Sequence, residues 1–368
     1  MRRVLGLFWT PKNWIIFAGL ASGTLAALMT NWGNPANKGL SISCSIREIA
    51  GALGLHQGIA AQYLRPEIAG LALGAFVASL IFRDFRARGG SSPLLRFLFG
   101  AFVMIGAAVF LGCNTGTLVR LAGGDLNGIT GLAGIVVGVL IGVYFMKRGF
   151  YLGSAKEMHV MTGWMIPLVM LGLIVLVITK PPFIFFSEYG AGSQYALLGI
   201  ALAVGLIVGF LAQRTKMCFM GGWRDLFLAK DTYLFRGIVA FFIAALIANY
   251  LVGNFTEGTL LGKDIVYHWG FTDQFFAHDD HLWNFLSMVL VGLGATLLGG
   301  CPLRQMVLSG EGDNDAGVVV LGMLAGAALA HNFLIKSGVE GARDSGPIAV
   351  IIGLAFCLIV GFIVREKF

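Results

Sequence analysis

Apolar runs long enough to cross a membrane recur along almost the whole chain. A membrane-spanning helix needs roughly 20 consecutive, mostly apolar residues. Only 12% of the residues are charged and the mean hydropathy is +0.82, whereas a soluble domain carries about 25% charged residues. The sequence therefore predicts an all-α integral membrane protein with ten transmembrane helices. The spans are expected near residues 14–30, 66–82, 95–112, 127–146, 160–179, 195–213, 236–253, 284–300, 316–335 and 347–364.

The charges of the loops predict the orientation of these spans. Lysine and arginine are enriched in the cytoplasmic loops of membrane proteins. The loops after spans two, four and six are basic, whereas the loop 254–283 is rich in aspartate. All the basic loops share one side if both termini are cytoplasmic. We therefore expect a multi-pass protein of the cell inner (plasma) membrane, and this bias accounts for the formal charge of +7 without nucleic-acid binding.

An internal repeat divides the chain into two halves. The Gly-Cys pair at 112–113 recurs at 300–301, and the Gly-Asp pair at 124–125 recurs at 312–313, both at an ungapped offset of 188. Five spans in each half is an odd number, so the second half must enter the membrane upside down. Inverted repeats are a common transporter architecture. We predict one repeat over 1–182 and a second, inverted repeat over 183–368.

Four short segments between the spans each carry a cysteine near their beginning. They are too short and too polar to cross a membrane, and such segments persist at membrane depth only where they line a cavity or pack inside protein. If they are re-entrant helices, their N-termini point inward and favour an anion. The segments are 41–54 with Cys44, 113–124 with Cys113, 216–229 with Cys218 and 301–312 with Cys301.

The cysteine pattern favours a functional role over a structural one. A single buried cysteine usually acts as a small hydrophobic residue, and Cys357, inside the last span, fits that description. Four cysteines that open four non-spanning segments, matched between the halves, do not. Because the chain contains no C-x-x-C pair, zinc-finger, haem-attachment and thioredoxin-like motifs are excluded.

Several polar residues accompany these cysteines. An arginine follows each of them within seven residues, and the four guanidinium groups predict a positive funnel that concentrates an anion. Cytoplasmic charge bias also explains the two arginines in the second half. The four arginines are Arg47, Arg120, Arg224 and Arg304.

Other polar residues lie near the ends of the predicted spans. Asp125 and Asp313 are expected to cap helices, and His331-Asn332 is a site candidate because polar pairs are rare inside membranes.

Three motifs resemble those of the YeeE/YedE family of membrane proteins. They are Cys-Asn-Thr-Gly-Thr-Leu-Val-Arg (113–120), Met-Cys-Phe-Met-Gly-Gly-Trp-Arg-Asp (217–225) and Gly-Cys-Pro-Leu-Arg-Gln (300–305). Gly-Glu-Gly-Asp-Asn-Asp (310–315) and Ala-His-Asn (330–332) are similar to the YedE branch, whose members are described as selenium transporters. The resemblance covers essentially the whole chain. It implies uptake of a sulfur or selenium species past cysteines that match Cys113, Cys218 and Cys301, with Cys44 as the first-half counterpart.

These observations lead to one hypothesis and three alternatives. The hypothesis is a transporter, not an enzyme, that takes up a small selenium- or sulfur-containing anion through a path lined by thiols. The alternatives are a thiosulfate-specific transporter, a membrane thiol oxidoreductase or persulfide relay, and an assembly scaffold. The path residues are Cys44, Cys113, Cys218, Cys301, Arg47, Arg120, Arg304 and Asn114, with Arg224, His331 and Asn332 as further candidates.

The sequence also bears on cofactors and partners. It contains no nucleotide-binding loop, so any energy for transport must come from a gradient or from a partner. No cofactor or metal is expected. The expected partners are the anionic substrate, the lipid bilayer and a cytoplasmic carrier protein for sulfur or selenium, and nucleic acid is not among them.

Overall fold

The computed structural model describes residues 11–256 and 266–365, and an apolar helix lies at each of the ten predicted spans. Within these residues, nine helical segments are long and apolar enough to cross a membrane, and α4, with 16 residues, is shorter. A four-residue helix, α8 (Val160–Gly163), leads into α9. The helices at the ten predicted spans, called the long helices below, are α2 (Pro11–Asn31), α4 (Pro66–Ile81), α5 (Pro93–Phe110), α7 (Asn127–Lys147), α9 (Met165–Thr179), α10 (Leu198–Thr215), α12 (Tyr233–Val252), α13 (His281–Leu297), α15 (Asn314–Asn332) and α16 (Ser345–Ile363).

The four cysteine-bearing segments fold as short helices. They are α3 (Ile42–Ala52), α6 (Asn114–Ala122), α11 (Phe219–Ala229) and α14 (Pro302–Gly310). Three of the cysteines are themselves the N-cap residue of the short helix, whereas Cys44 follows its N-cap, Ser41, by three residues. Together with the long helices, these pieces form the broken-helix architecture in which transporters place their substrate sites.

A left-handed residue reverses the backbone two positions before each N-cap cysteine. Leu111 has φ 63°, Lys216 has φ 55° and Gly299 has φ 81°. A positive φ is uncommon for residues other than glycine, and this conformation ends α5 at Leu111 and α10 at Lys216. The chain therefore turns sharply before each short helix begins, and the turn sets the position of the thiol.

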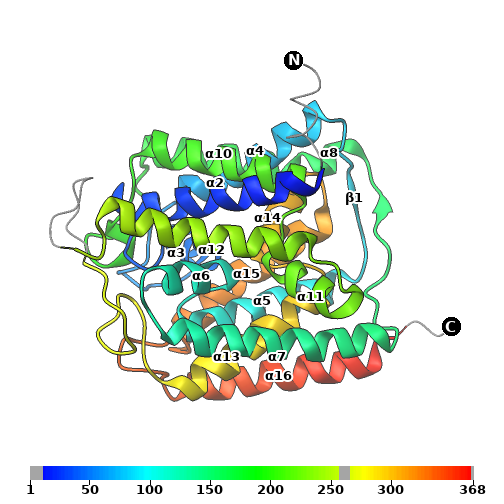
Figure 1. Cartoon of the computed structure of the whole chain (residues 1–368). Helices are drawn as coiled ribbons and strands as arrows, with labels where there is room; N and C mark the ends of the chain where they lie inside the picture. Colours follow the sequence, from blue (N-terminus) through cyan, green and yellow to red (C-terminus); the bar gives the residue numbers. More distant parts are fainter. Residues whose placement is uncertain (1–10, 257–265, 366–368) are drawn as a thin grey trace.

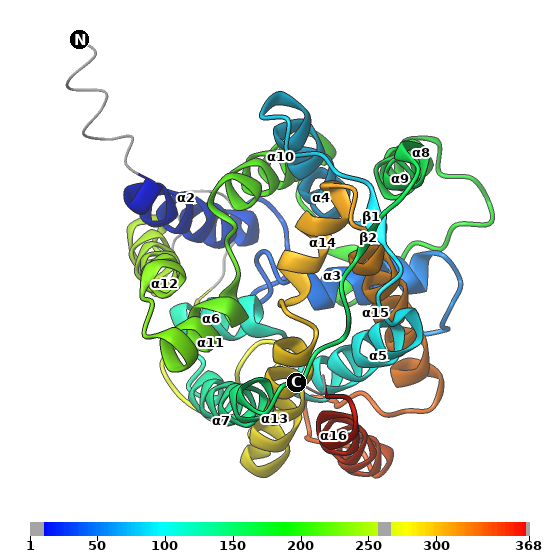
Figure 2. The same cartoon turned by 90° about the vertical axis from the view of Figure 1, so that its right-hand side faces the viewer.

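The long helices pair between the two halves of the chain. The most extensive contacts join α2 to α12, α4 to α10, α5 to α15 and α7 to α13, and Figures 1 and 2 show these helices side by side. In order along each half, α2, α4, α5 and α7 correspond to α10, α12, α13 and α15. Replacing each helix by its counterpart converts the first pair into the second and the third pair into the fourth, as two inverted repeats would require. The division into repeats 1–182 and 183–368 stays a prediction.

Matched glycines allow two of these pairs to approach closely. A Cβ added to Gly134 on α7 would lie 2.3 Å from the carbonyl oxygen of Phe285 on α13. A Cβ added to Gly322 on α15, 188 residues later, would lie 2.1 Å from the carbonyl oxygen of Phe97 on α5. Small residues at helix crossings are the usual means of tight packing in membranes, and here they serve equivalent crossings in the two halves.

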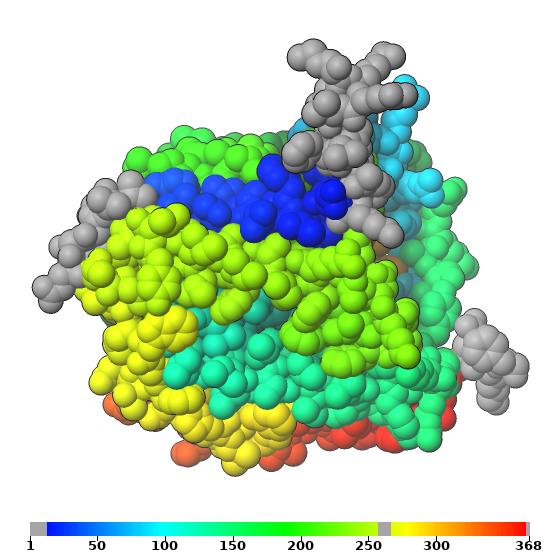
Figure 3. All heavy atoms as spheres, viewed as in Figure 1, coloured from blue at the N-terminus to red at the C-terminus, as the bar shows by residue number. Residues whose placement is uncertain are grey.

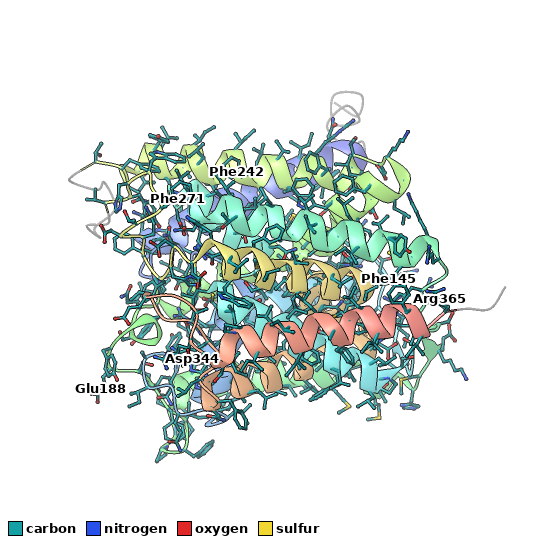
Figure 4. The ribbon with its side chains drawn as sticks, turned by 90° about the horizontal axis from the view of Figure 1, so that it is seen from below. Phe145, Glu188, Phe242, Phe271, Asp344 and Arg365 are labelled. Carbon is teal, nitrogen blue, oxygen red and sulfur yellow. The ribbon has the colours of Figure 1, made fainter. Side chains whose placement is uncertain are left out.

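Both described ends of the chain lie on one face of the helical bundle, which we call the termini face. The beginning of α2 and the end of α16 are on the same side in Figure 1, and Figure 2 looks onto that side. The short sheet of β1 (Arg88–Gly89) and β2 (Lys156–Glu157) also lies there. In Figure 4, Glu188 and Asp344 lie at the opposite end of the bundle from Arg365. We call that end the opposite face.

The outside of the bundle carries apolar side chains. In the space-filling view, α2, α12 and α7 form a continuous face (Figure 3). On α16, Ile351, Ile352 and Ile359 are all more than half exposed. Lipid is the environment that such a surface requires. The chain is a multi-pass membrane protein, whereas the choice of membrane and the sidedness of the termini stay predictions.

Candidate functional site

A cavity of about 180 Å³ opens among the loops of the opposite face. Cys44 and Arg47 of α3 line it together with Lys38 from the preceding loop and Lys336 from the loop between α15 and α16. The backbone turn at Leu111, just before Cys113, forms another part of the wall. The cavity therefore brings together three cationic side chains and one thiol from segments far apart in the sequence.

The cations outnumber the carboxylates that balance them. Lys38 Nζ lies 2.5 Å from Glu48 Oε2, and Arg47 Nη2 lies 3.4 Å from Glu48 Oε1. Arg47 Nε is buried without a hydrogen-bond partner. Lys38, Arg47 and Lys336 in the wall and Glu48 behind it carry a combined formal charge of +2. A buried guanidinium N–H without an acceptor is costly. Both features suit an anionic ligand.

Lys336 lies outside the membrane-spanning helices, and its surroundings weaken its hold on a proton. Burial and the neighbouring charges of Arg47 and Arg343 lower the pKa of Lys336 to about 8. Desolvation and like charges both disfavour the protonated ammonium. The positive charge of the cavity is therefore complete below about pH 8 and falls above it.

A series of sulfur contacts leads from the cavity into the protein. Cys44 Sγ is 3.7 Å from the carbonyl oxygen of Leu111, and Cys113 Sγ is 3.8 Å from Ser41 Oγ. Asn114, the first residue of α6, places its Nδ2 3.8 Å from Met220 Sδ, while its Oδ1 is buried without a partner. These contacts link the two cysteine segments of the first half to α11 of the second half.

The last two cysteines of this series meet directly. Cys218 Sγ is 3.8 Å from Cys301 Sγ, and the backbone amide of Gly221 donates to Cys218 Sγ over 3.1 Å. Cys218 begins α11 and Cys301 begins α14, so two helix N-termini converge on the thiol pair. The sequence contains no closely spaced cysteine pair, but the fold creates one from residues 83 positions apart.

Three basic residues lie within six positions of Cys218 or Cys301 in the sequence: Lys216, Arg224 and Arg304. Glu311 Oε1 lies 3.0 Å from Arg304 Nη1 and 3.3 Å from Lys216 Nζ. Glu311 therefore balances the charge of Arg304. Arg224 pairs with Asp225 at 2.8 Å and also reaches the carbonyl oxygen of Gly299. The basic residues near the inner cysteines are thus already engaged by carboxylates.

Arg120 departs from its expected place in an open funnel. Its side chain is 1% exposed and forms a 2.5 Å ion pair with Asp125. Arg120 Nη1 donates to the carbonyl oxygen of Phe110, and the guanidinium stacks over the Phe110 ring at 4.2 Å. Buried charges are stable when paired in this way, so Arg120 braces the end of α6. Asp313 caps α15 as expected, accepting from the Ala316 amide.

His331 and Asn332 lie beside the cavity. The ring of His331 stacks on that of His56 with centroids 3.9 Å apart, and Asn332 Nδ2 donates to the carbonyl oxygen of Leu55 over 3.0 Å. His56 Nε2 in turn lies 3.0 Å from the carbonyl oxygen of Arg47. The end of α15 therefore holds the segment after α3 in place, next to the cavity cation Arg47.

Sequence reasoning missed Lys38, Lys336, Glu48 and His56. Each lies in a loop or short helix and gains its neighbours only through folding. One signal was present: in the predicted orientation, Lys38 and Lys336 are basic residues in loops on the side that charge bias leaves poor in lysine. A cation that charge bias does not explain invites a functional explanation.

The broken helices, the cationic cavity and the thiol series together define a polytopic α-helical protein built on a transporter-like plan. Residues 214–364 match the Sulphur transport family. It is similar to the thiosulfate transporter TsuA of Escherichia coli (strain K12), at 26% identity over 120 residues. It is also similar to TsuA of Spirochaeta thermophila, at 27% identity over 116 residues.

These two similarities are partial. Each alignment covers 32% of this chain, and it covers 30% of the Escherichia coli protein and 31% of the Spirochaeta thermophila protein. The chain thus matches about a third of the length of each of these relatives.

Proposed function

We propose that the protein imports a small sulfur-containing dianion of the thiosulfate class, or its selenium analogue, across the cell inner membrane. The anion enters at the opposite face, which faces outward, and leaves at the termini face, which faces the cytoplasm. Cys44, Cys113, Cys218 and Cys301 act as successive weak binding groups. The observation that carries this proposal is the series of contacts that leads from the cationic cavity, through residues of α3, α6 and α11, to the Cys218–Cys301 pair.

The chemistry of thiols suits passage better than tight binding. A neutral thiol is a weak hydrogen-bond donor, and several weak sites in series let an anion move without being trapped. The N-termini of α6, α11 and α14 add partial positive charge along the same line. Arg47 and Lys336 attract the anion at the entrance, and Arg304 and Arg224 receive it near the exit. The side chains hold the anion non-covalently and need no cofactor for this step.

The test is uptake into proteoliposomes that contain the purified protein. Radiolabelled thiosulfate should accumulate in these vesicles and not in protein-free vesicles. Unlabelled thiosulfate, selenite and sulfate are then compared as competitors. Competition by selenite at concentrations similar to thiosulfate extends the substrate class to selenium, whereas competition by thiosulfate alone supports the narrower alternative. Uptake that does not exceed the protein-free background contradicts the proposal.

The Cys218–Cys301 pair favours one second candidate, a persulfide relay. Two thiols 3.8 Å apart could pass a sulfur atom, because a thiolate attacks the outer sulfur of thiosulfate to give a persulfide and releases sulfite. Mass spectrometry of the intact protein separates the two functions. A relay predicts one added sulfur atom after exposure to thiosulfate and release of sulfite, whereas transport predicts an unchanged mass.

A further inference from the structure

A fully buried carboxylate lies directly behind the wall of the cationic cavity. Glu48 has an exposed fraction of 0% and contacts two of the cavity cations, Lys38 at 2.5 Å and Arg47 at 3.4 Å. It also pairs with Arg65, which is equally buried. Glu48 thus contacts Lys38 and Arg47 from inside the protein, and an anion in the cavity would contact the same two cations from the cavity side.

Arg65 holds this carboxylate permanently in place. Its Nη1 donates to Asn34 Oδ1 over 3.0 Å, and its Nη2 donates to the carbonyl oxygens of Ala191 and Gln194 over 2.8 and 2.9 Å. Its Nε donates to Glu48. Every nitrogen of the guanidinium is used, and two of its partners are backbone groups. Arg65 therefore anchors Glu48 and is not available to a ligand.

Arg47, in contrast, is held loosely. Charge-assisted N–H···O contacts are usually about 2.7–2.9 Å long, and the Arg47–Glu48 contact of 3.4 Å is well beyond that. Arg47 Nε is buried without an acceptor. Lys38 is held more tightly by Glu48, but Lys38 and Arg47 both line the cavity. An anion there can satisfy Arg47 and share Lys38 with Glu48.

We propose that Glu48 acts as a competing anion: it competes with the transported anion for Lys38 and Arg47 and thereby limits how tightly the cavity binds the transported anion. This inference rests on the proposed function. The combined charge of +2 with Glu48 present matches a dianion, whereas without Glu48 the cavity would hold the anion too strongly to release it inward. A conducting site must bind weakly enough to let its ligand leave.

The exit repeats the same arrangement. Arg47 follows Cys44 by three residues, and Arg304 follows Cys301 by three. Glu311 contacts Arg304 and Lys216, as Glu48 contacts Arg47 and Lys38. At each end of the thiol series, one carboxylate thus lies between a lysine from another segment and the arginine of the helix that carries the cysteine. The same role as a competing anion at both ends would require this arrangement.

The experiment measures equilibrium binding of radiolabelled thiosulfate to the purified full chain, and then uptake into proteoliposomes. For Glu48→Gln we expect the dissociation constant to fall about tenfold, which corresponds to ~1.4 kcal/mol, while the maximal uptake rate also falls. The matched control is Glu67→Gln. Glu67 belongs to the same buried cluster and contacts Arg65 at 3.8 Å, but its loss leaves Glu48 in place, so binding should stay near the wild-type value.

Two further variants keep the inference testable if Glu48→Gln does not fold. Glu48→Asp keeps the charge but withdraws the carboxylate from Lys38, so affinity should rise by a smaller factor. Lys38→Met removes one of the contested cations, and binding should weaken about tenfold or more. Binding by Glu48→Gln or Lys38→Met that equals wild type overturns the inference.

The outcomes also separate this inference from the proposed function. If wild type binds thiosulfate and Glu48→Gln binds it no more tightly, the function stands and the competitor role is wrong. If wild type neither binds nor transports thiosulfate, selenite or sulfate but Glu48→Gln binds sulfate alone, the competitor role stands and the proposed substrate is wrong. If neither protein binds any of the three anions, both are wrong.

Discussion

At the scale of single residues, the charge of the entrance depends on Lys336. Its ammonium lies near Arg47 and Arg343, and the rings of His56 and His331 border the same loop. These neighbours and burial lower the pKa of Lys336 to about 8, whereas a free lysine titrates near 10.4. Small changes of external pH around this value therefore alter how many positive charges face an incoming anion.

This predicts a pH dependence of anion binding. Lysine is charged below its pKa, so the third cation is present at lower pH and lost as the pH rises through about 8. Thiosulfate binding should weaken about tenfold across that rise, the factor that corresponds to ~1.4 kcal/mol. The measurement is a series of binding isotherms at constant ionic strength. In Lys336→Arg the weakening near pH 8 should become smaller, because arginine remains charged there. The part that remains belongs to Lys38, whose pKa burial and the charge of Arg65 also lower to about 8. Retention of the same pH profile in Lys336→Arg would assign it to another group.

At the scale of elements, the cysteine helices were the best-predicted part of the site. Segments 41–54, 113–124, 216–229 and 301–312 contain α3, α6, α11 and α14, because length and polarity alone exclude them as spans. What the sequence could not show is which of these helices meet. Cys218 and Cys301 come together because left-handed turns after α10 and α13 direct the next helix inward. The turn at Lys216 could not be predicted, because the left-handed residue there is not a glycine.

The helix crossings give a second prediction at this scale. Gly322→Ala would place a methyl group 2.1 Å from the Phe97 carbonyl oxygen, so α5 and α15 must separate. Overpacking of this kind costs about 1–3 kcal/mol, and the melting temperature in detergent should fall. Gly134→Ala, at the equivalent crossing of α7 with α13, should behave alike.

The control for these substitutions is Gly172→Ala. Gly172 is in α9, where an added Cβ would meet nothing within 4 Å. Alanine is the better helix former, so the melting temperature should stay constant or rise slightly. Equal losses in Gly322→Ala and Gly172→Ala would show that the crossings do not depend on the missing side chain.

At the scale of the whole molecule, composition was enough to predict the class and the spans, but it could not predict the entrance. All ten predicted spans are helices, since hydropathy is a property of each segment by itself. The cavity, in contrast, takes Lys38 from the loop after α2 and Lys336 from the loop after α15. No local pattern links positions so distant. For Arg120 the local pattern was misleading. Its position after Cys113 predicted a guanidinium open to an anion, whereas in the structure this guanidinium is buried in an ion pair with Asp125.

The orientation in the membrane is directly testable. Glu188 is exposed at the opposite face, and Glu157 is exposed near the termini face. We expect Glu188→Cys to react with an impermeant thiol reagent added outside right-side-out membrane vesicles. Glu157→Cys should react only after the vesicles are made permeable. The five native cysteines are buried, so wild-type protein provides the background. The reverse labelling pattern would place the cationic cavity on the cytoplasmic side.

The central claim is that four thiols in series carry the anion, and the most direct measurement is thiosulfate uptake by single cysteine-to-serine variants in proteoliposomes. We expect Cys44→Ser, Cys113→Ser, Cys218→Ser and Cys301→Ser each to lose about tenfold or more of the initial rate, the factor that corresponds to ~1.4 kcal/mol. Cys357→Ser, which alters a buried cysteine of α16 outside the series, should transport at the wild-type rate. Wild-type uptake by a Cys113→Ser/Cys301→Ser double variant would contradict the account.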